Sequence, residues 1–410
     1  MKRFGWILVI LMLAMPAWAA KRVTVQQLEE LLGASKNKSD ADVSNQLSDL
    51  ELSERLSDAR FSALKAALPG DKAQQALLAL ADQSQILDPP ASEIPSTPAP
   101  DFAAQRHIMS LVVAYVSKSI PQLPNIFATQ QTAFYQETPK SFEGVVFSSY
   151  QPLHLLRSSN ATVRYSNGLE VVEEVSADGK KSRIAGDQLQ SRGIFGPILT
   201  TVLMDAAKNK LVWGRWEKGA SGPLAVFNYA VPKEKSNYEV DYCCVADSYG
   251  AKKRFHQLAG YHGQMSVDPV SGNILRLTLE AELKENDPLS KAAIVVDYGP
   301  VEIGGKTYIC PVKSISLSRA QTTQLLHDEE HPSVMVGSGS RASSVAVATT
   351  SGGSSVVAGP QRTLLNDSVY SDYHIFRAES HVLAGNVEEG GAPTSSEEAK
   401  AQEPAAAAPA

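Results

Sequence analysis

The spacing of apolar residues changes from helical to alternating along this chain, and that change most constrains its fold. From about Ala128 onward, apolar and polar residues alternate in short segments, which is typical of strands with one buried face. In residues 275–283, Leu275, Leu277 and Leu279 alternate with polar residues. Such segments, about a dozen at short spacing, predict one antiparallel meander that is strongly curved or partly closed.

Turn signals divide the alternating region into hairpins. Asn167-Gly168 favours a tight hairpin turn, and residues 268–273 and Gly304-Gly305 mark two more turns. The apolar parity shifts near Lys313, which predicts a β-bulge or sharp bend there. A single helix, residues 195–209, is expected to interrupt the strands.

The N-terminal part has a different composition. Residues 20–87 are rich in Leu, Ala, Gln and Ser, and their apolar residues recur at helical spacing. Thr24 is suited to cap the first helix, and Pro69-Gly70 stops a later one. These residues predict a small antiparallel helical unit that packs or interacts, because no polar cluster in it resembles a catalytic set.

Proline marks the next boundary. Residues 88–101 contain five prolines in fourteen residues, which favours an extended, semi-rigid linker. A further amphipathic helix starts near Phe102, and residues 102–335 are expected to form an antiparallel half-barrel domain. The predicted fold class is therefore α+β: a small helical unit, then a strongly curved antiparallel meander (an unclosed β-barrel) with a packed helix.

The C-terminal part changes composition again. Residues 336–361 are rich in Gly, Ser and Val, which predicts a flexible insertion. Residues 362–385 are expected to supply the final strand of the half-barrel. Residues 386–410 are acidic and rich in Ala and Pro, which predicts a disordered tail.

The first residues are typical of an export signal. Lys2 and Arg3 precede the apolar run Phe4–Met15, and Ala17-Trp18-Ala19 fits the small-residue rule for signal peptidase. Residues 1–19 are therefore predicted to be a signal peptide, with an uncleaved anchor as the alternative. We expect a periplasmic or otherwise secreted protein with no transmembrane span after cleavage and possible peripheral contact with the envelope.

Composition and motifs exclude several function classes. A net charge of −6 argues against nucleic-acid binding, and 3 Cys are too few for a disulfide-built scaffold. His327, Glu330 and His331 match an inverted zinc-peptidase pattern, but Pro332 ends any helix at once. A solvated charged loop is the expectation there, so we predict no enzyme, no catalytic residue, no metal and no cofactor.

The cysteines suggest one disulfide in an oxidising compartment. Strand alternation places Cys244 and Cys310 on apolar faces, which favours a Cys244–Cys310 bridge with Cys243 pointing away. A Cys243–Cys310 bridge after a local bulge and three reduced thiols are the alternatives.

Aromatic residues gather in the alternating region. They would form either ordinary core or the lining of an apolar cavity on the concave side of the curved sheet. The candidate ligand-binding residues are Phe134, Tyr165, Trp213, Trp216, Phe227 and Tyr229.

Three features together resemble known proteins: a helix within a curved meander, the turn Val267–Asn273 before a long amphipathic strand, and the hairpin Tyr298–Lys306. They resemble an uncharacterised group of secreted bacterial proteins and, more remotely, the periplasmic lipoprotein-carrier (LolA/LolB-like) half-barrel superfamily. That resemblance implies an unclosed barrel with a helical lid that binds acyl chains or other apolar ligands.

The sequence therefore predicts an exported, non-enzymatic protein whose half-barrel binds an apolar ligand or a lipidated partner. An envelope scaffold or interaction protein without a small ligand is the alternative. A metal-dependent hydrolase that uses His327, Glu330 and His331 is less favoured.

Overall fold

The structure is a computed structural model. It describes residues 21–138, 151–175, 181–182, 188–189, 193–246, 252–327 and 354–375. The predicted signal peptide and C-terminal tail lie outside the described residues, as do Glu330 and His331.

The N-terminal residues form a helical unit with its own core. Its helices are α1 (Val25–Ala34), α2 (Asp40–Ser48), α3 (Asp58–Ala66) and α4 (Asp71–Gln83), and two short strands, β1 (Lys21–Val23) and β2 (Leu50–Leu52), pair in parallel. Thr24 caps α1 in a capping box with Gln27. Leu28, Leu47 and Leu77 are fully buried in a cluster made only of residues from this unit.

The proline-rich segment connects this unit to the sheet. The 3₁₀ turn η1 (Ser84–Ile86) precedes this segment, the 3₁₀ turn η2 (Ala91–Glu93) lies within it, and α5 (Phe102–Ala114), which Asp101 caps, follows it. The helix continues through a π turn, η3 (Tyr115–Ser119), and ends in the 3₁₀ turn η4 (Ile120–Gln122), which contains Pro121.

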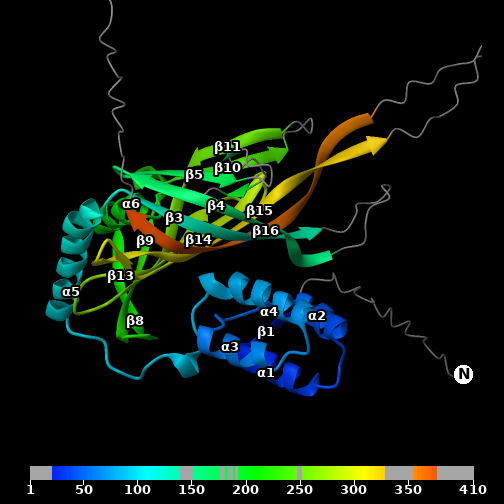
Figure 1. Cartoon of the computed structure of the whole chain (residues 1–410), viewed down its shortest axis with the longest axis horizontal. Helices are drawn as coiled ribbons and strands as arrows, with labels where there is room; N and C mark the ends of the chain where they lie inside the picture. The colour runs from blue at the N-terminus through cyan, green and yellow to red at the C-terminus, as the bar shows by residue number, and fades with distance from the viewer. Residues whose placement is uncertain are drawn as a thin grey trace, which may run out of the picture. The chain divides into compact units, whose positions relative to one another are not determined.

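A large antiparallel sheet forms most of the rest of the described chain (Figure 1). Its strands are β3 (Ile126–Thr138), β4 (Gln151–Ser166), β5 (Leu169–Val175), β6 (Lys181–Ser182), β8 (Lys210–Gly219), β9 (Gly222–Val231), β12 (Gly260–Val267), β13 (Ile274–Glu282), β14 (Leu289–Ile303), β15 (Lys306–His327) and β16 (Ser354–Ile375). Among the described residues, the spatial order is β6-β5-β4-β3-β16-β15-β14-β13-β12-β9-β8, and the two edge strands do not pair with each other. The predicted α+β fold with a curved, unclosed antiparallel sheet is confirmed.

The predicted turns have local causes that the structure confirms. Asn167 and Gly168 both have positive φ, 50° and 80°, as a tight hairpin between β4 and β5 requires. Gly304 and Gly305 turn β14 into β15 in the same way. Between these two strands the register shifts at Val312, so the bulge predicted near Lys313 is present.

Two features differ from the sequence prediction. The strand β10 (Glu239–Ala246) leaves the meander and pairs with β11 (Lys252–Leu258) and β7 (Gln188–Leu189) in a separate sheet. The last strand starts at Ser354, inside the segment predicted to be a flexible insertion, because its backbone pairs with the distant end of β15. The pairing of β10 with β7 and of β16 with the end of β15 joins segments far apart in sequence, so local composition did not reveal either feature.

The two faces of the large sheet carry different partners. On β14, Ile294 and Val296 face the main core, together with α5, α6 (Pro197–Ala207) and β10; we call this the inner face. Ala293 and Val295 point the other way and pack with Ala79 of α4; we call this the outer face. The helical unit therefore lies against the outer face.

The predicted Cys244–Cys310 disulfide is wrong. Cys243 and Cys244 are bonded to each other, and Cys310 is a buried free thiol. Cys310 belongs to the main core from β15, whereas the other two lie on β10 in the separate sheet. The prediction placed both strands in one sheet, and that assumption produced the wrong pairing.

Candidate functional site

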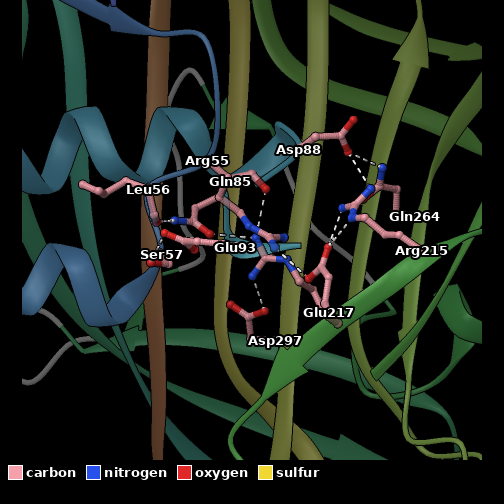
Figure 2. A network of polar contacts seen from close by, with 11 residues as sticks. Arg55, Leu56, Ser57, Gln85, Asp88, Glu93, Arg215, Glu217, Gln264 and Asp297 are labelled. Atoms are coloured by element: carbon pink, nitrogen blue, oxygen red, sulfur yellow. Dashed lines mark hydrogen bonds and ion pairs between the residues drawn. The ribbon is translucent and has the colours of Figure 1, made fainter. Parts of the chain in front are cut away.

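Charged and amide side chains hold the helical unit against the outer face. The register places Arg215, Val226, Ser266, Arg276 and Asp297 in one row across five strands. Since side chains in register share a face, this row presents two guanidinium groups and a carboxylate to the helical unit. Figure 2 shows the resulting network of contacts.

Glu217 on β8 is the centre of this network. Its carboxylate contacts Arg55, which follows β2, at 2.7 Å and also binds Arg215. Burial alone would raise the pKa of Glu217, but the two neighbouring guanidinium groups hold it below its ordinary value. The carboxylate therefore stays ionised, and it binds an arginine of the helical unit and an arginine of the sheet at once (Figure 2).

Arg215 extends the network to the linker. It donates to Asp88 Oδ1 and to Gln264 Oε1, both at 2.8 Å, and Gln264 Nε2 donates to the same Asp88 oxygen at 2.7 Å. On the neighbouring residue, the indole N–H of Trp216 donates to the carbonyl of Pro98 at 2.9 Å. The linker is therefore bound to β8 at both ends of its proline-rich stretch.

Arg276 on β13 forms the second connection. It contacts Asp297 at 2.5 Å and donates to the carbonyl and the side-chain oxygen of Gln85 at 2.9 and 2.7 Å. The amide of Gln85 in turn donates to Leu56 O in the helical unit. This chain of hydrogen bonds orients η1 on the sheet (Figure 2).

A cavity of about 420 Å³ lies beside this network, on the outer face. Most of its wall comes from β8, β9, β12 and β13, and Ile86 and Asp88 cover one side. The residues that line it are Ile86, Asp88, Lys210, Val212, Asn228, Tyr229, Ala230, His262, Gly263, Gln264, Thr278, Leu279 and Glu280.

The strand register explains why the cavity is open and polar. Ala230 lies between Lys210 and His262 in one row, so a small side chain separates two longer basic ones. In the part of the chain that the structure describes, the Lys210 ammonium has no ion pair and the Asn228 amide has no hydrogen bond. His262 lies 4.0 Å from Glu280, too far for a hydrogen bond. The cavity thus offers free donors on one side and carboxylates on the other.

Most of the predicted ligand-binding aromatics lie in the packed inner face. Trp213 contacts Trp216 and Phe227 edge to face, with ring centroids 4.9 and 5.5 Å apart. Tyr229 is buried, donates to Thr278 O at 2.5 Å and also borders the outer-face cavity. All four residues lie on β8 and β9, where Trp213 contacts the two neighbouring aromatics and Tyr229 packs edge to face on Tyr261 of β12, with ring centroids 5.9 Å apart.

The other two predicted residues lie apart from them. Tyr165 stacks on Phe195 with centroids 5.7 Å apart. Phe134 lies beneath the guanidinium of Arg157, 3.7 Å from the ring centroid. Whether any of the six binds a ligand stays a prediction.

Sequence analysis missed the residues that make the outer-face site. Lys210, Asn228, His262 and Gln264 occupy alternate positions of their strands, where a half-buried strand normally faces water. Polar residues at matching positions of neighbouring strands could have indicated the site. Which positions match is known only once the strand register is known.

The remaining predictions concern metal binding, membrane crossing and the hydrolase pattern. Among those residues, no cluster of three or more His, Cys, Asp or Glu side chains is arranged to hold a metal ion. No helix in the described ranges has the length and apolar character needed to cross a membrane. The hydrolase pattern stays a prediction, because of its three residues only His327 lies within the described part, at the end of β15.

Comparison with known proteins adds no assignment: no family model matches this chain, and neither the curated proteins nor the solved structures contain a significant match.

Proposed function

We propose that this chain is an exported, non-enzymatic binding protein that holds a small polar ligand in the outer-face cavity. The observation that carries the proposal is a cavity of about 420 Å³ with free donors at its wall. Lys210 is exposed and Asn228 is half-buried at the cavity wall, so both donors are accessible to a ligand that accepts hydrogen bonds from them.

The charges around the cavity favour a small carboxylate that also carries donor groups, such as an amino acid or a sugar acid. The carboxylate would accept from Lys210 Nζ and Asn228 Nδ2, which lie on adjacent strands. Asp88 and Glu280 would accept from the ammonium or hydroxyl groups at the other end of the molecule. Each charge-assisted hydrogen bond typically contributes roughly 1.5–3 kcal/mol.

Calorimetry of the full chain with glycine, glutamate, glucuronate and uncharged glucose would test this proposal. At least one of the carboxylates should bind, and Lys210→Met should weaken its binding by about tenfold or more, the equivalent of one charge-assisted hydrogen bond. Lys218→Met is the matched control, because Lys218 is an exposed lysine of the same strand outside the cavity. The proposal fails if no carboxylate binds or if both lysine variants bind alike; an envelope scaffold without a small ligand then becomes the better candidate.

A second candidate is the apolar ligand or lipidated partner that the lipoprotein-carrier resemblance implies. The feature that favours it is α5, which buries Ile108 and Val112 against the inner face but leaves Phe102 and Val113 exposed. A helix held by so few buried residues is suited to move aside for an acyl chain. Lipid extraction of the purified chain, followed by mass spectrometry, should recover a stoichiometric lipid; its absence, together with no uptake of a fluorescent fatty acid, would exclude this candidate.

A further inference from the structure

Three charged side chains meet where α4 packs on the outer face of the sheet. Lys313 on β15 contacts Asp82 of α4 at 2.8 Å and Asp367 of β16 at 3.4 Å. Both carboxyls are nearly inaccessible, with exposed side-chain fractions of 2% and 8%. One lysine therefore faces two buried carboxyls, and their charges do not balance if both are ionised.

The unpaired atoms at this site indicate where a proton resides. Asp82 Oδ2 and Asp367 Oδ1 are buried and have no hydrogen-bond partner among the described residues, although Lys313 Nζ lies 3.4 Å from Asp367 Oδ1. Two neighbouring buried carboxyl groups form a hydrogen bond with each other when one of them is protonated and donates to the other. A proton on Asp82 would give both oxygens a partner and leave a balanced pair of Asp367 and Lys313.

We propose that Asp82, Asp367 and Lys313 form a proton-dependent latch that holds the helical unit on the sheet most firmly in acid and loosens its hold as the pH rises to neutral. The unit has its own buried core, and its apolar contact with the sheet is a smaller, separate cluster that includes Leu78, Ala79 and Ile86. The unit can therefore leave the sheet while keeping its own fold.

The pKa of Asp82 sets the direction of the switch. Burial first, and then the neighbouring Asp367, raise it from its ordinary 3.8 to about 7, although Lys313 opposes the shift. A carboxyl whose pKa is higher in the docked state binds an extra proton on docking. Docking is thus favoured most below pH 4 and weakens as the pH rises through about 7. Between pH 6 and pH 8.5 the docking constant should fall about tenfold.

Among the described residues that face the latch, no other charged or titratable group changes its charge between pH 6 and pH 8.5 in a way that would substitute for protonation of Asp82. Asp297 on β14 is opposite Lys313 in register, but Arg276 neutralises it. On β3, burial raises the pKa of the Tyr135 hydroxyl above its ordinary value, so it stays neutral at these pH values. On β4, Leu153 and Leu155 provide only apolar contact.

The latch also regulates the cavity, and this consequence rests on the proposed function. Ile86 and Asp88, which cover one side of the cavity, follow α4 directly in the chain. Release of α4 would remove that cover. The ligand should therefore bind more weakly at pH 8.5 than at pH 6.

Hydroxyl-radical footprinting of the full chain at pH 6 and pH 8.5 tests the latch without any ligand. Tyr135 is buried beside Ala79, so its oxidation reports undocking. Relative to the exposed Phe102, the oxidation rate of Tyr135 should rise about tenfold at the higher pH, provided that opening is rare. In Asp82→Asn, whose amide donates without titrating, the rate should stay low at both pH values.

Three variants make the result specific. Asp367→Asn should also abolish the pH dependence, and it provides a second test if Asp82→Asn does not fold. Asp49→Asn, an exposed residue of the same unit, should keep the pH dependence. Glu170→Gln should keep it too, which matters because burial raises the pKa of Glu170 to about 7 elsewhere in the molecule.

Equal Tyr135 oxidation at both pH values, or a rise that persists in Asp82→Asn, would overturn the latch. Failure of the calorimetric test with Lys210→Met would overturn only the proposed ligand site, because footprinting does not depend on a ligand. The two proposals can therefore fail separately.

Discussion

The inner and outer faces of the large sheet are both buried at β14, but different interactions stabilise them. On the inner face, tyrosine hydroxyls bond to fixed acceptors: Tyr298 to Ile194 O at 2.9 Å and Tyr261 to Asp205 at 3.0 Å. On the outer face, Arg55, Glu217 and Lys313 form ion pairs between two units that each have a core. Because apolar burial stabilises the inner face, this face forms as the chain folds. The stability of the charged contacts on the outer face depends on protonation and on the salt concentration.

The largest effect should come from shortening a core side chain of the inner face. Leu277→Ala removes methyl groups from a position with 1% exposure, which typically costs about 2–5 kcal/mol of unfolding free energy. Leu169→Ala, at a position with 71% exposure, should cost less than about 0.5 kcal/mol. Urea unfolding of both variants measures the difference, and similar midpoints would contradict the packing assigned to the inner face.

The next effect should come from the outer-face network. Glu217→Gln leaves the largely buried guanidinium group of Arg55 without a counter-charge and leaves Arg215 paired with Asp88 alone, which should cost roughly 2–4 kcal/mol. Glu51→Gln, which breaks the exposed pair with Arg22, should cost less than about 1 kcal/mol. Thermal unfolding monitored by far-ultraviolet circular dichroism would separate the two. If Glu217→Gln is as mild as its control, the network does not hold the helical unit.

A smaller effect should appear on the inner face as the pH changes. Glu170 accepts from the amides of Gly193 and Phe195, and burial raises its pKa from 4.5 to about 7 despite these bonds. Its protonated form is therefore favoured in the folded state, and its contribution to stability is lost as the pH rises from about 4.5 to 7. Because Glu170 is only half-buried, we expect a loss of about 1–2 kcal/mol. Glu170→Gln should flatten this slope in urea unfolding between pH 5 and 8; an unchanged slope would exclude Glu170 as its source.

The smallest effect should follow reduction of the disulfide. A bond between adjacent residues closes almost no loop, so reduction should change stability by less than about 1 kcal/mol. Non-reducing peptide mapping should recover Cys243 and Cys244 linked within one peptide. Cys310, whose pKa burial raises to about 12, should react with iodoacetamide only after denaturation. A peptide linked to Cys310 would contradict this assignment.

Much of the architecture could be predicted because its causes are local. Thr24 caps a helix, Asn167-Gly168 adopts positive φ, and alternation along residues 275–283 matches a strand with a buried face. Each feature depends on a few neighbouring residues, so the sequence alone determined the capped helix, the hairpin turn and the antiparallel α+β class.

Tertiary structure decided which strands became neighbours and what covered each face. Cys244 and Cys310 have similar alternating surroundings, yet their strands belong to different sheets. Arg276 and Gln85, far apart in the chain, form a hydrogen bond only because η1 lies on the outer face. Strand order and docking depend on contacts between distant segments, for which one sequence carries no periodic signal. The candidate ligand site and the latch are both products of that docking, so sequence analysis did not reveal them.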